Sequence, residues 1–286
     1  MTSKNKDIYK IQPVKGNAEK GIFNQRAWQS EADAHLLSAK LLNRAAVDAK
    51  FELEGKFQEC LQKGETAQIN TLANQVEAYS KSAILLLGYA IETFLKSGLV
   101  RLYQYVERED FLRIIKKYYG HDLSKAAYDL GIKLMPDQTK SLQRIRELIL
   151  DEARYPVTPK SKKHYSSATN KINREIWSDE VFNEWLDIAE TIRDYIHKID
   201  FDSNNPAIIK PYKLGFDGYF ILRFGGNLPP YLIAKFSKEG IRNVVTFSDI
   251  KGYFADKHND SAFARYVISR WDQFVPIDVN KCLGIK

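Results

Sequence analysis

The longest hydrophobic run of the chain lies in Ser80–Tyr103, SKSAILLLGYAIETFLKSGLVRLY. Nearly all of residues 83–91 are apolar, so a helix formed here would be apolar almost all the way round. That pattern is typical of a helix buried in a bundle. A membrane span needs about 20 mostly apolar residues, and Glu92 and Lys96 interrupt the run too early. The pattern therefore predicts a central core helix and no membrane segment.

Glu92 and Lys96 are four positions apart on this predicted helix. Residues at that spacing are neighbours on one helix face and can form an ion pair. One interpretation is that Glu92 is simply paired where the helix emerges from the core. The other is that Glu92 is a carboxylate held near a polar site inside the bundle.

Shorter helical patterns surround the central run. A polar arm is expected over residues 1–24. Apolar residues at helical spacing then predict helices over about 25–50, from 65 or 79 into the central run, over 109–119, over 123–130, and from Pro136 to about 153. Residues 51–64, which include Gly55 and Gly64, could form a helix end followed by a turn, and Gly120 and Gly131 are placed to end the helices before them. His121 and Asp122 stand before one of these helices, where Asp122 is expected to act as the cap.

A further helix with a regular apolar stripe is predicted after Ser178-Asp179, which are good capping residues. A second stripe on its flank ends in Arg193 and His197. Positions four apart differ by about 40° around a helix axis, so these two side chains can reach one spot. With Asp194 beside the arginine, such a pair suits a phosphodiester, because Arg binds phosphate oxygens and His transfers protons near neutral pH.

Residues 154–174 form a basic segment that has two prolines and no acidic residue, which favours an exposed loop. Basic residues interleaved with aromatic ones suit phosphates and unstacked bases. The RNA-binding candidates here are Arg154, Tyr155, Lys160, Lys162, Lys163, Tyr165, Lys171 and Arg174. An ordinary solvated lysine-rich loop explains the same composition equally well.

The pattern changes after the sequence DSNNP at residues 202–206. Short aromatic and β-branched runs at 219–224 and 231–236 predict two strands joined by a loop longer than a tight hairpin. A third strand is expected at 244–247, and helices at 248–255 and 261–274. We therefore predict a mainly α chain with a helical bundle over 25–204 and a small α+β domain over 205–286. The aromatic residues of this domain, Tyr219, Phe220, Phe224, Tyr231 and Phe236, either fill its core or contact a protein partner.

Composition adds a moderately basic balance. The net charge of +7 favours polyanionic partners without identifying one. Cys60 and Cys282 are too few and too far apart for the usual disulfide framework or metal-binding set. The first residues are polar and lack the apolar run of a signal peptide, so a cytoplasmic setting is expected.

Residues of about 25–200 resemble the HEPN family, a helical family of prokaryotic toxin–antitoxin, antiviral and RNA-processing proteins. The resemblance is carried by GYAIETFLK (88–96), GHDLSKAAYDLGI (120–132), ARYP (153–156) and the last helix with Arg193 and His197, in this order. Residues 205–286 lie outside it.

This resemblance implies a bundle of four or five helices, commonly dimeric, whose active members are ribonucleases that need no metal or other cofactor. His197 would take the proton from a ribose 2′-hydroxyl or serve the leaving oxygen. Arg193 would stabilise the charged phosphorane-like state. Asp194 matches the polar residue that usually follows the arginine, and Glu92 is the candidate supporting acid.

The chain departs from the family in the spacing of this motif. Only three residues separate Arg193 from His197, fewer than is usual, and the change alters the relative direction of the two side chains. Two functions are therefore carried forward. One is an RNA-binding protein, either without catalytic activity or with the activity of a metal-independent endoribonuclease. The other is a non-catalytic module that partners a nucleotidyltransferase or another defence component. DNA binding through a helix-turn-helix has little support, because no strong turn joins an obvious helix pair.

Overall fold

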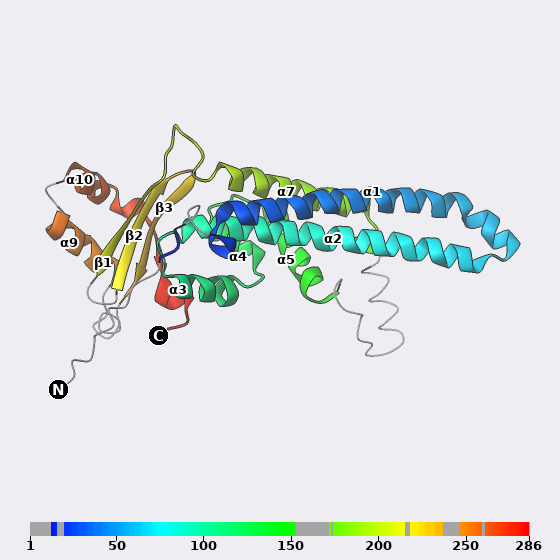
Figure 1. The fold of residues 1–286 in the computed structure, drawn as a ribbon, viewed down its shortest axis with the longest axis horizontal. Helices are drawn as coiled ribbons and strands as arrows, with labels where there is room; N and C mark the ends of the chain where they lie inside the picture. The colour runs from blue at the N-terminus through cyan, green and yellow to red at the C-terminus, as the bar shows by residue number, and fades with distance from the viewer. Residues whose placement is uncertain are drawn as a thin grey trace. The chain divides into compact units, whose positions relative to one another are not determined.

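The structure is a computed structural model that describes residues 13–15, 20–152, 172, 174–214, 218–236, 246–258 and 261–285. The chain divides into two compact units. Unit 1 contains residues 1–25, 98–120 and 198–286, and unit 2 contains residues 26–97 and 121–197. The fold is mainly α with a small sheet, as the sequence predicts (Figure 1).

Unit 2 is built on a long helical hairpin of α1 (Gln25–Lys63) and α2 (Thr66–Leu102), seen in Figure 1. The turn between them contains Gly64 at a positive φ of 71°. Further helices described in this unit include α4 (Leu123–Asp129), α5 (Pro136–Glu147) with its π-helical continuation η4 (Leu148–Glu152), and α7 (Asp179–Lys198). The first helix continues past its predicted end near residue 50 and through Gly55 to Lys63. Helix α2 runs unbroken from Thr66, so of its two predicted starts the earlier is confirmed.

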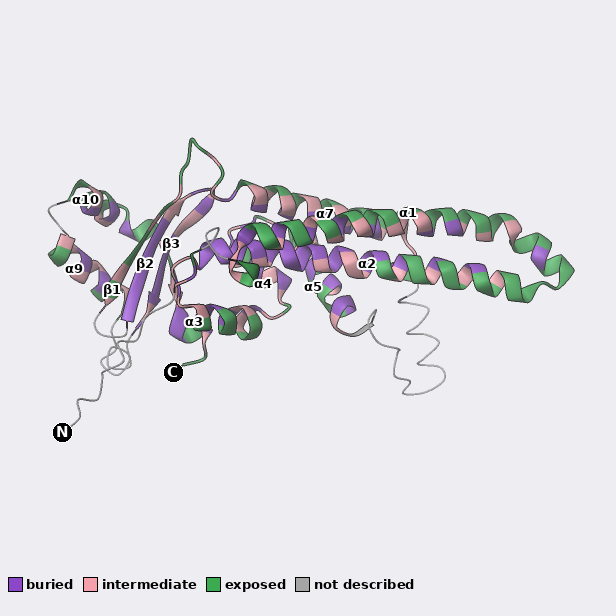
Figure 2. Ribbon diagram, in the orientation of Figure 1, coloured by how far each residue is buried: buried purple, intermediate pink, exposed green. Residues whose placement is uncertain are grey.

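The C-terminal half of α2 is the core helix that the apolar run predicts. Ala83, Leu87, Ile91 and Phe94 are essentially inaccessible to solvent. Figure 2 shows α2 changing from exposed near the hairpin turn to buried further along. One 18-residue window of α2 is apolar enough to cross a membrane by length and composition alone, and 78% of that window is buried inside the structure.

Gly88 is the point of closest approach on α2. A Cβ atom placed there would lie 2.6 Å from Cδ1 of Ile149 in η4, well inside van der Waals contact. Only glycine therefore lets η4 pack this closely against the core helix.

Unit 1 contains a four-stranded sheet in the order β1 (Ile208–Leu214), β2 (Gly218–Gly225), β3 (Leu228–Lys235) and β4 (Val275–Asp278). The first three strands are antiparallel neighbours, and β4 pairs with β3 in parallel. One face of the sheet is covered by α9 (Phe247–His258) and α10 (Ala262–Ser269), whose side chains share a core with Phe220, Leu222 and Leu232.

The other face of the sheet packs on the beginning of α3 (Arg108–Arg113). The backbone N–H of Glu107 donates to the hydroxyl of Tyr219 over 3.4 Å, and Lys235 donates to Asp110 over 2.6 Å. The π-helical segment η3 (Ile114–Tyr119) continues α3 up to Gly120, where φ is 53°. The remaining short elements of this unit are η2 (Gly21–Phe23), η5 (Trp271–Gln273) and α11 (Val279–Cys282).

This division differs from the predicted boundary between 25–204 and 205–286. The last turn of α2 and the α3–η3 segment belong to the sheet unit. The N-terminal arm also joins it, because Val14 is fully buried and exchanges backbone hydrogen bonds with Tyr105 and Val106. Sequence patterns did not show this, since the contacts join segments far apart along the chain.

Several predictions in the C-terminal part were wrong. The β2–β3 connection is a tight turn at Gly226-Asn227, both with positive φ, and Pro229-Pro230 lie inside β3 beside a shift in strand register. Paired positive φ values favour such a two-residue turn. Phe247 begins α9 and is not in a strand, while Val244 lies outside the described residues. The last predicted helix ends at Ser269, followed by η5 and β4.

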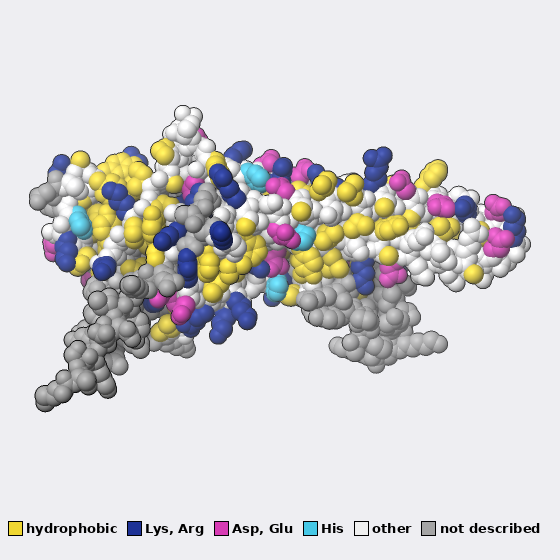
Figure 3. All heavy atoms as spheres, viewed as in Figure 1, with side chains coloured by type: hydrophobic (Ala, Val, Ile, Leu, Met, Phe, Trp, Pro, Cys, Tyr) yellow, Lys and Arg dark blue, Asp and Glu magenta, His cyan; other side chains and the backbone are white. Residues whose placement is uncertain are grey.

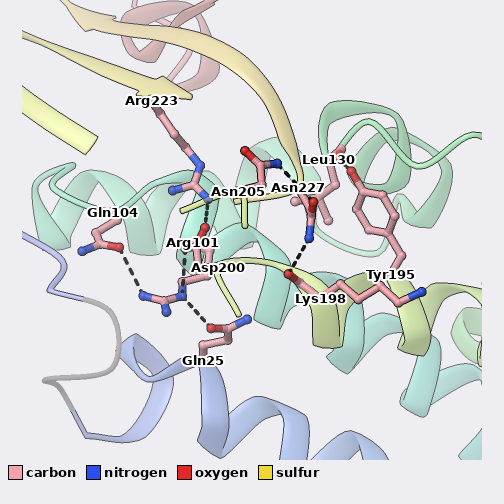
Figure 4. Close-up of polar contacts among 10 residues, drawn as sticks. All are labelled: Gln25, Arg101, Gln104, Leu130, Tyr195, Lys198, Asp200, Asn205, Arg223 and Asn227. Atoms are coloured by element: carbon pink, nitrogen blue, oxygen red, sulfur yellow. Dashed lines mark hydrogen bonds and ion pairs between the residues drawn. The ribbon is translucent and has the colours of Figure 1, made fainter. Parts of the chain in front are cut away.

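A buried ionic cluster in unit 1 is drawn in Figure 4. Arg223, fully buried on β2, donates to Asp200 over 2.6 Å. The Nε atom of Arg101 lies 3.3 Å from the other oxygen of Asp200 and donates to Gln25 over 2.5 Å. Two guanidinium groups thus share one carboxylate, which costs less than leaving either charge buried alone.

The turn after β2 is shaped around this cluster. A Cβ atom on Gly226 would lie 2.1 Å from Oδ1 of Asp200, and the backbone N–H of Asp200 donates to the carbonyl of Gly226. Asp200 itself has a positive φ of 63°, which costs free energy for a residue with a side chain. Its ion pairs and backbone bond hold it there.

Candidate functional site

Helix α7 presents the Arg193–His197 pair that the sequence predicts. Ser178 caps the helix by accepting from the backbone N–H of Val181 over 3.2 Å, as expected. The apolar stripe is buried, with Trp185, Ile188 and Ile192 nearly inaccessible. Since Arg193 and His197 lie on its flank, their backbone positions are set by core packing.

Arg193 and His197 both meet Asp33 of α1. The Nε atom of Arg193 donates to Oδ1 of Asp33 over 2.7 Å. The Nε2 atom of His197 lies 3.5 Å from Oδ2 of the same carboxylate. This nitrogen is buried and has no hydrogen bond within the described part of the chain. The ring of His197 also meets Phe94 edge-on, at 6.0 Å between centroids. One carboxylate thus contacts both candidate side chains, through a hydrogen bond to Arg193 and a close approach to His197.

The three side chains remain partly open to solvent. The exposed fractions are 42% for Arg193, 38% for His197 and 37% for Asp33. The hydrogen bond to Asp33 raises the pKa of Arg193 above its ordinary value, although burial acts in the opposite direction. Asp194 follows the arginine and is mostly exposed, with Oδ1 3.8 Å from Nη1 of Arg193.

The Arg193–Asp33 pair also continues a row of ion pairs between α1 and α7. Lys50 pairs with Asp179, and Lys40 pairs with Glu190 over 2.5 Å. The order of these pairs along the two helices shows that α1 and α7 run antiparallel. Among these three ion pairs, as far as the structure describes them, only the Asp33–Arg193 pair also has a histidine beside its carboxylate.

Glu92 does not join this group. It accepts from Lys96 over 2.5 Å, which confirms the predicted i,i+4 pair, and its other oxygen lies 2.9 Å from Nδ1 of His121. Positions two apart on a helix differ by about 200°, so Glu92 and Phe94 leave α2 on opposite sides. Because Phe94 contacts His197, the carboxylate of Glu92 faces away from the Arg193–His197 pair.

His121 and Asp122 have the structural roles that the sequence predicts. Asp122 caps α4 by accepting from the backbone N–H of Lys125 over 3.0 Å, and the imidazole of His121 is held by Glu92. The arrangement also puts Lys96 at 5.8 Å from the ring centroid of Trp28. Glu92 therefore belongs to a separate polar group with Lys96 and His121. This agrees with its pairing to Lys96 and with a carboxylate held near a polar group.

Most of the basic segment 154–174 lies outside the described residues. This applies to Arg154, Tyr155, Lys160, Lys162, Lys163, Tyr165 and Lys171. Arg174 is described and is an exposed helical residue.

Asp33 is the residue of the candidate site that sequence reasoning missed. It is one of several acidic residues on α1 and stands next to Ala32, a member of the apolar stripe. That adjacency shows that Asp33 borders the core, but its partner is 160 residues away. Within the described residues, no three His, Cys, Asp or Glu side chains are grouped to hold a metal ion.

Comparison with models of protein families, with curated proteins and with solved structures found no match to this chain. Membership of the HEPN family therefore stays an expectation carried by the sequence fragments. What the site can do chemically is therefore argued from the geometry around Asp33, Arg193 and His197.

Proposed function

We propose that this chain is a cytoplasmic HEPN-like RNA-binding protein of a bacterial defence or toxin–antitoxin system, and that Arg193 and His197 contact the RNA backbone. The observation that carries the proposal is their convergence on Asp33 with about two fifths of each side chain exposed. A cation and an imidazole held this way are suited to a phosphodiester.

Asp33 limits the charge of this site but leaves it able to bind an anion. A guanidinium has five N–H donors, and the bond to Asp33 occupies the one on Nε. His197 adds a positive charge when it is protonated. The basic balance of the chain, +7, favours the approach of a polyanion.

RNA binding is tested by fluorescence anisotropy with labelled single-stranded RNA and tRNA at several salt concentrations. We expect Arg193→Ala to weaken binding roughly tenfold, as for the loss of one charged hydrogen bond, and to reduce the salt dependence. His197→Ala should weaken it less. The matched control is Lys40→Ala, which removes a similarly exposed partner of an α1–α7 ion pair. Equal effects of Arg193→Ala and Lys40→Ala would reject the site.

Endoribonuclease activity is the catalytic part of the proposal, and the short spacing of the motif weighs against it. In this scheme His197 takes the 2′-hydroxyl proton, and Arg193 stabilises the charge that develops on the phosphorus oxygens. The test is incubation of wild type, Arg193→Ala and His197→Ala with tRNA and total RNA in EDTA. Cleavage by wild type alone would establish the nuclease, and identical traces from all three would remove it.

A second candidate function, a non-catalytic protein-interaction module, is favoured by the outer surface of α1. Leu37, Leu41, Val47 and Phe51 are exposed, with Phe51 at 79%. At 100° per residue they fall within an arc of about 120°. Clustered exposed apolar side chains of this kind mark protein interfaces.

A second copy of this chain suits this row. Antiparallel pairing of two α1 helices about Arg44 would bring Leu41 opposite Val47 and Lys40 opposite Asp48, so apolar and charged positions are both self-complementary. We expect light scattering to give twice the chain mass of 33.0 kDa. Leu41→Glu should give the monomer, whereas Leu61→Glu, further along α1, should not. A monomeric wild type would reject self-association, and a stoichiometric complex with a nucleotidyltransferase would identify the row's partner instead.

A further inference from the structure

Unit 1 has a partly exposed surface on which a row of three aromatic rings has a cation at each end. It comprises Lys210 of β1, Phe224 of β2, and Phe263, Tyr266 and Arg270 on or just after α10. We call it the aromatic–cationic surface. Figure 3 shows hydrophobic side chains, tyrosine included, interspersed with Lys and Arg over α9 and α10.

Contacts join these residues into one row. Nζ of Lys210 lies 4.0 Å from the ring centroid of Phe263, which is stacked on Phe224 at 6.0 Å and 22°. Phe224 meets Tyr266 at 5.8 Å between centroids. The guanidinium carbon of Arg270 lies 4.7 Å from the ring centroid of Tyr266. Cations thus lie over rings at both ends of the row.

The row lies at the edge of the domain core: Phe224 and Phe263 are partly buried and pack against the core cluster, whereas Tyr266 is more exposed. Ala264 and Val267 point inward and are fully buried. Phe263, Tyr266 and Arg270 follow spacings of three and four on the adjoining face. Tyr266 is 44% exposed, and Lys210 and Arg270 are exposed as well. The domain core beneath is already filled by Phe220, Phe254 and Trp271, among others.

We propose that the aromatic–cationic surface binds unpaired bases of single-stranded RNA. This inference rests on the proposed RNA-binding function and assigns a role to the part of the chain outside the HEPN resemblance. Aromatic rings stack with any base, and neighbouring Lys and Arg pair with the phosphates. In the free protein the cations cover the rings. When they turn towards phosphates, they uncover the ring faces for bases.

The charge of the C-terminal part fits this ligand. Residues 205–286 contain twelve Lys and Arg against seven Asp and Glu, a net charge of +5 out of +7 for the whole chain. Stacking requires unpaired bases, whereas phosphate contacts alone do not distinguish single strands from duplexes. A preference for single-stranded over duplex RNA of equal length is therefore the signature of this surface.

The experiment uses the full chain and a uridine-rich single-stranded RNA carrying 4-thiouridine. Photocrosslinks mapped by mass spectrometry are expected on the peptide that contains Phe263 and Tyr266. Tyr266→Ala and Arg270→Ala should weaken binding of the single strand about fivefold or more, the lower end of the effect of removing one stacked base. Binding of duplex RNA should change less. Tyr128→Ala, at an aromatic residue that is 82% exposed on α4, is the matched control.

Each outcome decides between the two proposals. Crosslinks on α10 with weaker single-strand binding by the α10 variants support this surface. Suppose instead that wild type binds RNA, that Arg193→Ala loses this binding, and that both α10 variants bind like wild type without crosslinks on α10. This result would overturn the proposal for the aromatic–cationic surface and leave the proposed function standing. If wild type binds no RNA, both fail. Tyr266→Leu keeps the apolar contact and removes the ring. If this variant is folded but binds the single strand more weakly, the loss is due to stacking and not to unfolding.

Discussion

At the scale of the residue, Asp33 sets the charge of the candidate site. It accepts from Arg193 and lies beside Nε2 of His197, so with a neutral imidazole the three groups sum to zero. Such a carboxylate orients Arg193 and at the same time competes with phosphate for the guanidinium. The sequence indicated the Arg–His pair through spacing alone, whereas a partner 160 positions away requires the fold.

Replacing Asp33 by Asn tests this competition. The variant keeps the size of the side chain and adds one unit of positive charge to the site. We expect tighter binding of single-stranded RNA and a salt dependence steeper by about 0.7, as for one more neutralised phosphate. Anisotropy titrations at several salt concentrations measure both. Weaker binding would mean that orientation of Arg193 matters more than its net charge.

A second residue of consequence is Lys235, which donates to Glu107 over 2.9 Å and to Asp110 over 2.6 Å. Burial alone lowers the pKa of Lys235, but its bonds to the two carboxylates raise the pKa above the ordinary value of 10.5. Because the folded pKa is raised, this contribution to stability is complete below pH 10.5 and is lost as the pH rises through the folded value.

Lys235→Met is therefore expected to destabilise the protein at pH 7 by about 1–3 kcal/mol, because Asp110 loses a partner in a buried position. Between pH 9 and about pH 12 wild type should lose more unfolding free energy than the variant. Urea unfolding across this range measures the difference. Parallel pH profiles would show that the ion pair contributes nothing to alkaline stability.

At the scale of the element, α2 was predicted best because a run of consecutive apolar residues indicates its burial. The same holds for α7, with its capping serine and regular stripe. Strand β1, IIKPYKL, was missed because it lies at the sheet edge, is largely exposed and contains Pro211. Strand β4 has only four residues, and its parallel pairing with β3 joins distant segments. Edge strands and short strands carry little local signal.

Gly88 provides a test of the packing on α2. Gly88→Ala would place a methyl group 2.6 Å from Ile149, so we expect it to destabilise the fold by about 1–3 kcal/mol despite the better helix propensity of alanine. Gly55 in α1 is the matched control, because no atom of the described residues lies within 4 Å of its Cβ position. There, Gly55→Ala should stabilise by about 0.5–1 kcal/mol. Thermal unfolding of both variants measures the contrast, and equal shifts would contradict it.

At the scale of the whole molecule, the two compact units are not consecutive along the chain. The last turn of α2 and residues 98–120 belong with the sheet, where Glu107 and Asp110 pair with Lys235. Periodicity located the change of texture near residue 205, but it does not report which earlier segments the sheet packs against. A domain made of segments that are separated along the chain cannot be predicted from local sequence patterns.

A truncated chain ending at residue 204 tests this division. It would retain Tyr103, Phe111 and the buried end of α2 while removing the sheet that covers the α3 segment. We expect such a fragment to aggregate or to lose its cooperative unfolding, because exposed core surface favours association. Size-exclusion chromatography and thermal circular dichroism measure this. A monomeric fragment with a sharp transition would show that residues 25–204 fold on their own.

The side chain of Asn227, in the turn after β2, donates to the backbone carbonyl of Lys198 over 3.0 Å, and Asn205 donates to Asn227. The terminal carbonyl of α7 is thereby satisfied by a hairpin that is made 29 residues later. Surface turns of two residues are the usual choice for inserting an epitope tag or a fluorophore loop. In this chain an insertion at 226–227 would instead remove the hydrogen bond to the last carbonyl of the helix. Labels are therefore better placed elsewhere.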